Sequence, residues 1–259
     1  LGYGSDLDIV FLHNSVGDSC ETRGNESNAP KKIHNDIFFT RLVQKVIHIL
    51  STVTAGGKVF DTDLRLRPHG ESGPIISSIN AYEHYLINDA WLWEHQALVR
   101  ARAVTKSVML DDEFTRIRLK VLCQFRDLEV VRSSIRDMRN KMLDSNQTKS
   151  EMDFNIKKDI GGLIDIEFIV QFLVLSNAND HPKICENTDN IRILDACAEV
   201  GILELSVVNE LKEIYLTYRK HLHQLSLRLL PEIVDKSVFL KERSVVQKYW
   251  TRLLHSDST

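Results

Sequence analysis

Residues 4–11 read GSDLDIVF, and this short stretch decides what kind of fold the sequence encodes. Residues 6–12 (DLDIVFL) are rich in β-branched and aromatic residues and follow a Gly-Ser turn signal, which predicts a β-strand. Because successive side chains of a strand point to opposite faces, Asp6 and Asp8 share one face. An otherwise apolar strand thus carries two carboxylates side by side, and the question is what they bind.

A second acidic strand is predicted further along the chain. Apolar residues at helical spacing predict a helix over residues 36–52, with Asp36 as its N-cap. Gly56 and Gly57 then mark a turn into residues 58–68 (KVFDTDLRLRP), where apolar and charged residues alternate. In an extended strand the charged face carries Asp61, Asp63, Arg65 and Arg67. Such alternation alone is equally typical of a solvated sheet edge.

Carboxylates clustered on rigid strands suit a divalent cation. Mg²⁺ is usually bound by one or two carboxylates together with substrate phosphates and water. Two such ions can bind the attacking and leaving oxygens of a phosphoryl centre. A Gly-Ser pair before D-x-D, with a distal acidic strand, resembles the nucleotidyltransferases of the DNA polymerase β type. Backbone amides at Gly4 and Ser5 would then approach a triphosphate.

Composition narrows the class of partner. The chain has 259 residues, and its 33 basic and 36 acidic residues give a net charge of -3, which argues against a nucleic-acid partner. Its four cysteines lack C-x-x-C spacing and are typical of reduced thiols, so we expect a cytoplasmic location. No apolar run approaches the roughly 20 residues of a membrane span, so no membrane partner is expected.

The chain divides into two predicted domains. Residues 1–106 form a nucleotidyltransferase domain, with a mixed sheet and helices, and residues 107–259 form an α-helical bundle. Residues 153–168 read as a short strand, a glycine turn and the start of an apolar helix, and we expect this segment to return near the active site. The chain begins almost inside a strand, which predicts that the full protein starts upstream.

Four segments carry a more specific resemblance, in order, over nearly the whole chain: YGSDLDIVFLH (3–13), DTDLRLRPHGESGP (61–74), AWLWEHQALVRARAV (90–104) and GGLIDIEFIVQFLVL (161–175). Together they resemble the glutamine synthetase adenylyltransferases. Enzymes of this family have two related halves, one that attaches AMP to glutamine synthetase and one that removes it by phosphorolysis. The last two segments and DNIRILDACAEVGIL (189–203) are more similar to the AMP-attaching, C-terminal half. The family's G-K-L-G-G segment, which precedes the first acidic strand, is absent here.

The resemblance implies roles for individual residues. Asp6, Asp8 and Asp63 would be the catalytic carboxylates and metal ligands, with Asp63 as proton acceptor. Gly4, Ser5, Arg65, Arg67, Arg100 and Arg102 are the candidates for contact with ATP phosphates. Arg65 and Arg67 are equally expected to pair with the aspartates or to reach the phosphates. Arg100 and Arg102 would point to one side if their segment is extended. Asp61, Asp165 and Glu167 keep open roles.

The implied reaction is transfer of AMP from ATP to a tyrosine hydroxyl of glutamine synthetase, with release of pyrophosphate and with Mg²⁺ or Mn²⁺ as cofactor. The alternatives are phosphorolytic removal of AMP by the same metal cluster, or an inactive regulatory or scaffold module. By resemblance, a nitrogen-signalling regulatory protein of the PII type is a further partner.

Overall fold

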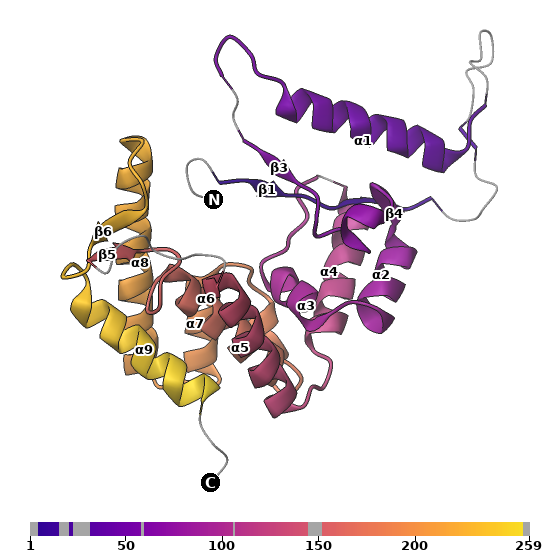
Figure 1. The fold of residues 1–259 in the computed structure, drawn as a ribbon. Coiled ribbons are helices and arrows are strands. Elements are labelled where there is room, and N and C mark those ends of the chain that lie inside the picture. Colours follow the sequence, from indigo (N-terminus) through magenta and orange to yellow (C-terminus); the bar gives the residue numbers. More distant parts are fainter. Residues whose placement is uncertain are drawn as a thin grey trace. The chain divides into compact units, whose positions relative to one another are not determined.

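The computed structural model describes residues 5–15, 21–22, 32–57, 60–105, 107–144 and 152–255, so Gly4 lies outside the described residues. The chain forms two compact units (Figure 1). One contains Tyr3–Ala90 and Ala103–Ile117, and the other contains Trp91–Arg102 and Arg118–Thr259. The stretch 91–102, placed in the first domain by the sequence analysis, clusters with the second unit.

Two parallel strand pairs organise the first unit. Strand β1 (Leu7–Asp8) pairs with β3 (Thr62–Asp63), and β2 (Phe11–His13) pairs with β4 (Ile76–Ser78). Parallel strands need a long crossover connection, usually a helix. Helix α1 (Asn35–Ser51) lies in the connection between β2 and β3 and contacts β3 and β4.

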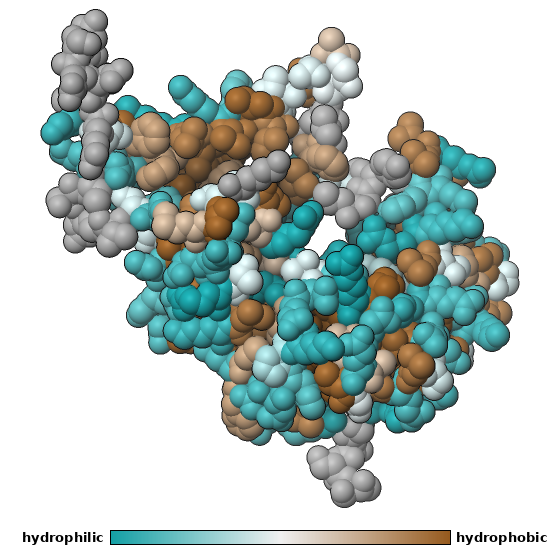
Figure 2. All heavy atoms as spheres, turned by 180° about the vertical axis from the view of Figure 1, so that it is seen from behind, coloured by the Kyte–Doolittle hydropathy of each residue, from teal (hydrophilic) through white to brown (hydrophobic). Residues whose placement is uncertain are grey.

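Helix α1 buries only part of its apolar surface within this unit. Val43 is buried, whereas five of its large apolar side chains are exposed: Ile37, Phe38, Leu42, Ile49 and Leu50. Figure 2 shows the apolar side chains as a brown patch over this helix. The helix predicted over residues 36–52 is confirmed, but Asp36 as its N-cap is wrong. His34 is the N-cap, and its Nδ1 accepts a hydrogen bond from Asp36 N at 3.4 Å.

The acidic strands are shorter than predicted. The strand expected over residues 6–12 is divided into β1 and β2. Of the strand expected over residues 58–68, residues 58–59 lie outside the described residues, and residues 60–68 contain only β3. Asp63 Oδ1 accepts a hydrogen bond from Arg65 N at 2.8 Å, and this local turn competes with strand pairing. The alternation therefore stops at Asp63, and the prediction that Arg65 and Arg67 continue an extended strand is wrong. A mixed sheet was expected, and the named strands of this unit form two parallel pairs instead.

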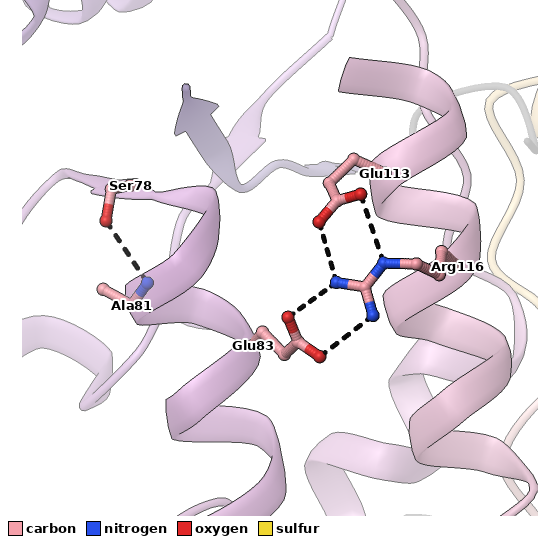
Figure 3. Close-up of polar contacts among 5 residues, drawn as sticks. All are labelled: Ser78, Ala81, Glu83, Glu113 and Arg116. Carbon is pink, nitrogen blue, oxygen red and sulfur yellow. Dashed lines mark hydrogen bonds and ion pairs between the residues drawn. The ribbon is translucent and has the colours of Figure 1, made fainter. Parts of the chain in front are cut away.

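Side-chain hydrogen bonds tie the remaining helices of the first unit. Helix α2 (Ile79–Asn88) is capped by Ser78, whose Oγ accepts from Ala81 N at 3.2 Å (Figure 3). Arg116 lies on α4 (Val108–Leu122), which belongs to this unit up to Ile117, and donates at 2.7 Å both to Glu113 and to Glu83 on α2 (Figure 3). The short 3₁₀ turn η1 (Gly70–Ser72) connects β3 to β4. An ion pair therefore joins α2 to α4.

The second unit surrounds one buried helix. Helix α6 (Leu163–Asn177) is apolar on all sides, as expected of a helix buried all round. It contacts five helices: α3 (Leu92–Val99), α5 (Leu128–Asp144), α7 (Asn190–Glu199), α8 (Leu205–Leu227) and α9 (Leu240–Leu254). A 3₁₀ turn η2 (Pro182–Cys185) and an antiparallel pair of β5 (Asp153–Asn155) with β6 (Ile233–Asp235) complete the unit. Within the described ranges, no helix combines the length and apolarity needed to cross a membrane.

A glycine turn and a buried ion pair begin α6. Gly161 has φ +81°, and a Cβ there would lie 2.9 Å from Arg243 O, so only glycine fits without strain. Asp165 accepts from Gly161 N at 2.6 Å and from Arg139 Nε at 2.5 Å. Arg139 also donates to Lys158 O at 2.8 Å. Burial raises the pKa of Asp165, and the Arg139 charge opposes that rise. Asp165, whose role was open, therefore belongs to a structural ion pair.

Breaking that pair should destabilise the second unit. Asp165→Ala leaves the Arg139 guanidinium, only 2% exposed, without its carboxylate. Removing one partner of a buried ion pair costs about 3–5 kcal/mol, so we expect a loss of stability of that size. Urea unfolding followed by circular dichroism measures it.

Arg116→Met is the matched control, because it breaks an ion pair whose arginine is 47% exposed. Exposed pairs contribute little, so this variant should unfold close to the parent. If Asp165→Ala were no less stable than Arg116→Met, the buried pair would not be a structural requirement.

Candidate functional site

The register of β1 and β3 brings the predicted carboxylates to one face. Leu7 N donates to Asp61 O at 2.7 Å and Ile9 N donates to Asp63 O at 2.9 Å. This register sets Asp8 opposite Asp63. Side chains of directly paired residues project to the same face, and Asp6 lies two residues before Asp8. Asp6, Asp8 and Asp63 therefore share one face of the strand pair.

A cavity of about 560 Å³ adjoins these strands. Its lining residues are Asp6, Asp61, Thr62, Asp63, Leu64, Arg65, Arg67 and Glu71. Asp6, Asp63, Arg65 and Arg67 were predicted as site residues, and the structure brings all four to this cavity. Glu71 was missed. The signal for it was its place in RPHGESGP, which follows the acidic strand within a few residues.

Asp63 is held by Arg65. The Asp63 side chain is 15% exposed and the Arg65 side chain is 71% exposed. Asp63 Oδ1 accepts from Arg65 N at 2.8 Å and from Arg65 Nε at 3.0 Å, and Oδ2 accepts from Nε at 2.8 Å and from Nη2. The hydrogen bonds from Arg65 lower the pKa of Asp63. The pKa of Arg65 is raised by Asp63 and to a smaller extent by Glu71 and Asp8. Of the two alternatives for Arg65, the structure has the pairing with an aspartate.

Arg67 holds the turn that follows β3. Its guanidinium donates to the backbone carbonyls of Leu64 at 3.0 Å, Glu71 at 3.1 Å and Gly73 at 3.3 Å. This arrangement matches neither alternative, pairing with an aspartate or reaching a phosphate. The physical reason is the end of the strand at Asp63, which turns Arg67 toward carbonyls of its own loop. A phosphate contact by Arg67 stays a prediction.

The remaining predicted arginines belong to the second unit. Arg100 is the C-cap residue of α3, so Arg100 and Arg102 do not share one extended strand. Arg100 Nη1 donates to Glu167 Oε1 at 2.8 Å, and Tyr215 OH donates to the same oxygen at 3.3 Å. Arg102 is exposed. Glu167, whose role was open, is thus the ion-pair partner of Arg100.

The donor set suits a hard divalent cation, although the side chains are not gathered around one. Carboxylate oxygens are the ligands that Mg²⁺ prefers, and Asp6, Asp8 and Asp63 supply them from adjacent strands. Among the described residues, no three Asp, Glu, His or Cys side chains converge as a metal site. Both oxygens of Asp63 accept hydrogen bonds from Arg65 instead. Ser5 is half-buried and lies two residues before β1 begins at Leu7.

The Asp63–Arg65 pair predicts a pH dependence. Because Arg65 lowers the folded-state pKa of Asp63 below the usual 3.8, the pair stabilises the fold above pH 3.8. That contribution is lost as the pH falls through the lower, folded-state pKa. We expect Arg65→Gln to raise the pKa of Asp63, measured by ¹³C NMR of its carboxyl carbon, with Asp63→Asn to identify the signal. An unchanged titration would contradict the pairing.

Two family models match successive parts of the chain. Residues 1–117 match glutamate-ammonia ligase adenylyltransferase, and residues 129–230 match GlnD PII-uridylyltransferase. The first match includes both acidic strands and the cavity. The second lies within the helical unit.

Relatives match along nearly the whole chain. They include the bifunctional glutamine synthetase adenylyltransferase/adenylyl-removing enzymes of Thioalkalivibrio sulfidiphilus, 42% identical over 254 residues, Hahella chejuensis, 43% over 258, and Pseudomonas putida, 42% over 265. Each alignment covers 98% of this chain and 26% of the relative, so the chain spans about a quarter of their length. The identity extends through both the acidic strands and the helical unit, and the chain therefore belongs to the glutamine synthetase adenylyltransferase family.

Proposed function

We propose that this chain transfers AMP from ATP to a tyrosine hydroxyl of glutamine synthetase and releases pyrophosphate. One observation carries the proposal. The parallel register of β1 and β3 sets Asp8 opposite Asp63, beside a cavity of about 560 Å³ that also contains Asp6. That arrangement suits a divalent cation and a phosphate-bearing substrate, and the names of the relatives specify an adenylyltransferase of glutamine synthetase.

Each group of site residues has its own role in this reaction. Asp6, Asp8 and Asp63 would hold Mg²⁺ or Mn²⁺, which when bound supplies positive charge to the phosphates. Backbone amides of Gly4 and Ser5, just before β1, would contact the triphosphate. Arg67 keeps the turn beside the cavity in place through Leu64, Glu71 and Gly73.

The transfer step makes one bond, breaks one bond and moves one proton. The tyrosine oxygen of the partner forms a bond to the α-phosphorus, and the bond from that phosphorus to the bridging oxygen breaks, so pyrophosphate leaves. Asp63 accepts the tyrosine proton, because a carboxylate at the reacting centre is a suitable general base. Arg100 and Arg102 remain candidates for contact with substrate, and Arg100 would have to exchange its partner Glu167 for that role.

The direction of transfer separates this proposal from its nearest alternative. The relatives are named for both attachment and removal of AMP. In phosphorolytic removal, inorganic phosphate would attack the α-phosphorus of adenylylated tyrosine at the same carboxylates, and the bond from that phosphorus to the tyrosine oxygen would break, so that ADP and the free tyrosine hydroxyl are released. The similarity of residues 129–230 to GlnD PII-uridylyltransferase supports a PII-type protein as a second partner, and we place the activity in the cytoplasm.

Neutralising Asp63 should abolish transfer without unfolding the chain. Asp63→Asn keeps the side-chain volume but removes a metal ligand and the proposed base. Transfer of label from α-labelled ATP to glutamine synthetase should then fall by roughly 10² to 10⁴-fold. Thermal melting in chelator should be close to that of the parent. The variant loses an ion pair whose arginine is 71% exposed and which therefore contributes little, and it also removes one charge from a cluster of like charges.

Asp112→Asn, on the exposed side of α4, is the control and should label at the parental rate. Labelling by Asp63→Asn at the parental rate would remove Asp63 from the reaction. Release of ADP from adenylylated synthetase with phosphate, and no labelling from ATP by the parent, would support removal of AMP instead.

A further inference from the structure

We infer that Arg65 is an internal counter-ion that occupies Asp63 until a divalent cation displaces it, so that metal binding requires release of the Asp63–Arg65 pair. This inference rests on the proposed function, because it concerns the same carboxylates. It assigns Arg65 a role other than direct binding of the metal or the reacting atoms. Arg65 is a positioning residue in this scheme.

Hydrogen bonding makes the two partners mutually exclusive. Asp63 Oδ1 and Oδ2 each accept from Arg65 Nε, at 3.0 and 2.8 Å, and Oδ2 also accepts from Nη2. A divalent cation needs carboxylate oxygen lone pairs directed at it, at distances shorter than a hydrogen bond. The guanidinium blocks that approach. This accounts for the absence of a three-ligand cluster in the described part of the chain, although Asp8 and Asp63 are paired in register.

Charge explains why a counter-ion is needed. Asp6, Asp8 and Asp63 share one face, and Asp61 lines the same cavity. Negative charges on one face repel one another, and water screens this repulsion little at Asp63, because its carboxylate is only 15% exposed. The Arg65 guanidinium supplies one positive charge to this group. A bound divalent cation would supply two, which makes the exchange electrostatically favourable.

The solvent exposure of the Arg65 side chain explains why it can separate from Asp63. Its side chain is 71% exposed, so the guanidinium can move into solvent or along the cavity without opening the core. Arg67 offers the contrast. It donates to three backbone carbonyls of its own turn, and removing it would disrupt that turn. Of the two arginines on the cavity wall, Arg65 is the one suited to exchange.

Metal affinity tests the inference without any measurement of activity. Mn²⁺ is titrated into the full chain in the absence of nucleotide, and free Mn²⁺ is measured by its electron paramagnetic resonance signal. If Arg65 competes with the cation, Arg65→Gln should bind Mn²⁺ with a Kd roughly tenfold lower than the parent, the effect of one unit charge near the site. Arg65→Lys keeps the charge but cannot cover both oxygens, so its Kd should lie between the two.

Arg41→Gln is the matched control. Arg41 is an exposed arginine of α1 in the same unit, so its removal changes the net charge equally without touching Asp63, and its Kd should match the parent. Melting temperatures check that every variant is folded. If Arg65→Gln binds Mn²⁺ with the parental Kd or more weakly, the inference is wrong while the proposed metal site stands. If neither parent nor variant binds Mn²⁺, the metal site of the proposed function is wrong as well.

Discussion

The parallel pairing of β1 with β3 is the constraint on which the proposed site depends. Asp8 lies opposite Asp63, and a slip of one residue would send one set of acids to the other face, since the period of a strand is two. The crossover through α1 permits parallel pairing, and the contacts of α1 with β3 and β4 fix where the second strand lies. A site built from two short strands is thus as dependent on the helix between them as on its own side chains.

Clustering acids on one face has a cost that the local sequence offsets. Asp63 ends its own strand by accepting from Arg65 N, and the same turn brings the Arg65 side chain back onto the carboxylate. Arg67 then stabilises the rest of the turn by donating to the carbonyls of Leu64 and Glu71. Residues 62–67 therefore contain a carboxylate (Asp63), its counter-ion (Arg65) and the arginine that supports the cavity wall (Arg67).

Periodicity in the sequence predicted the acids on a shared face and the helix between the acidic strands, because both follow from backbone geometry alone. It failed where side chains compete with the backbone. The alternation of Arg65 and Arg67 with apolar residues is typical of a strand, yet the hydrogen bond from Arg65 N to Asp63 ends β3. Periodicity also could not reveal the pairing of Asp165 with Arg139, since the two lie on different helices and meet only when α5 packs against α6.

Two arginine–aspartate pairs in this chain show how burial decides what an ion pair can do. Arg139 and Asp165 are both almost completely buried, and Arg139 donates further to Lys158 O, so neither ion can be released without exposing the core. Asp63 is nearly as well covered by hydrogen bonds, but its arginine is mostly exposed to solvent. The Arg65 guanidinium can therefore leave Asp63 with little loss of packing, and a divalent cation can take its place. The chemistry of the two pairs is the same, and the packing around the arginine makes one of them structural and the other exchangeable.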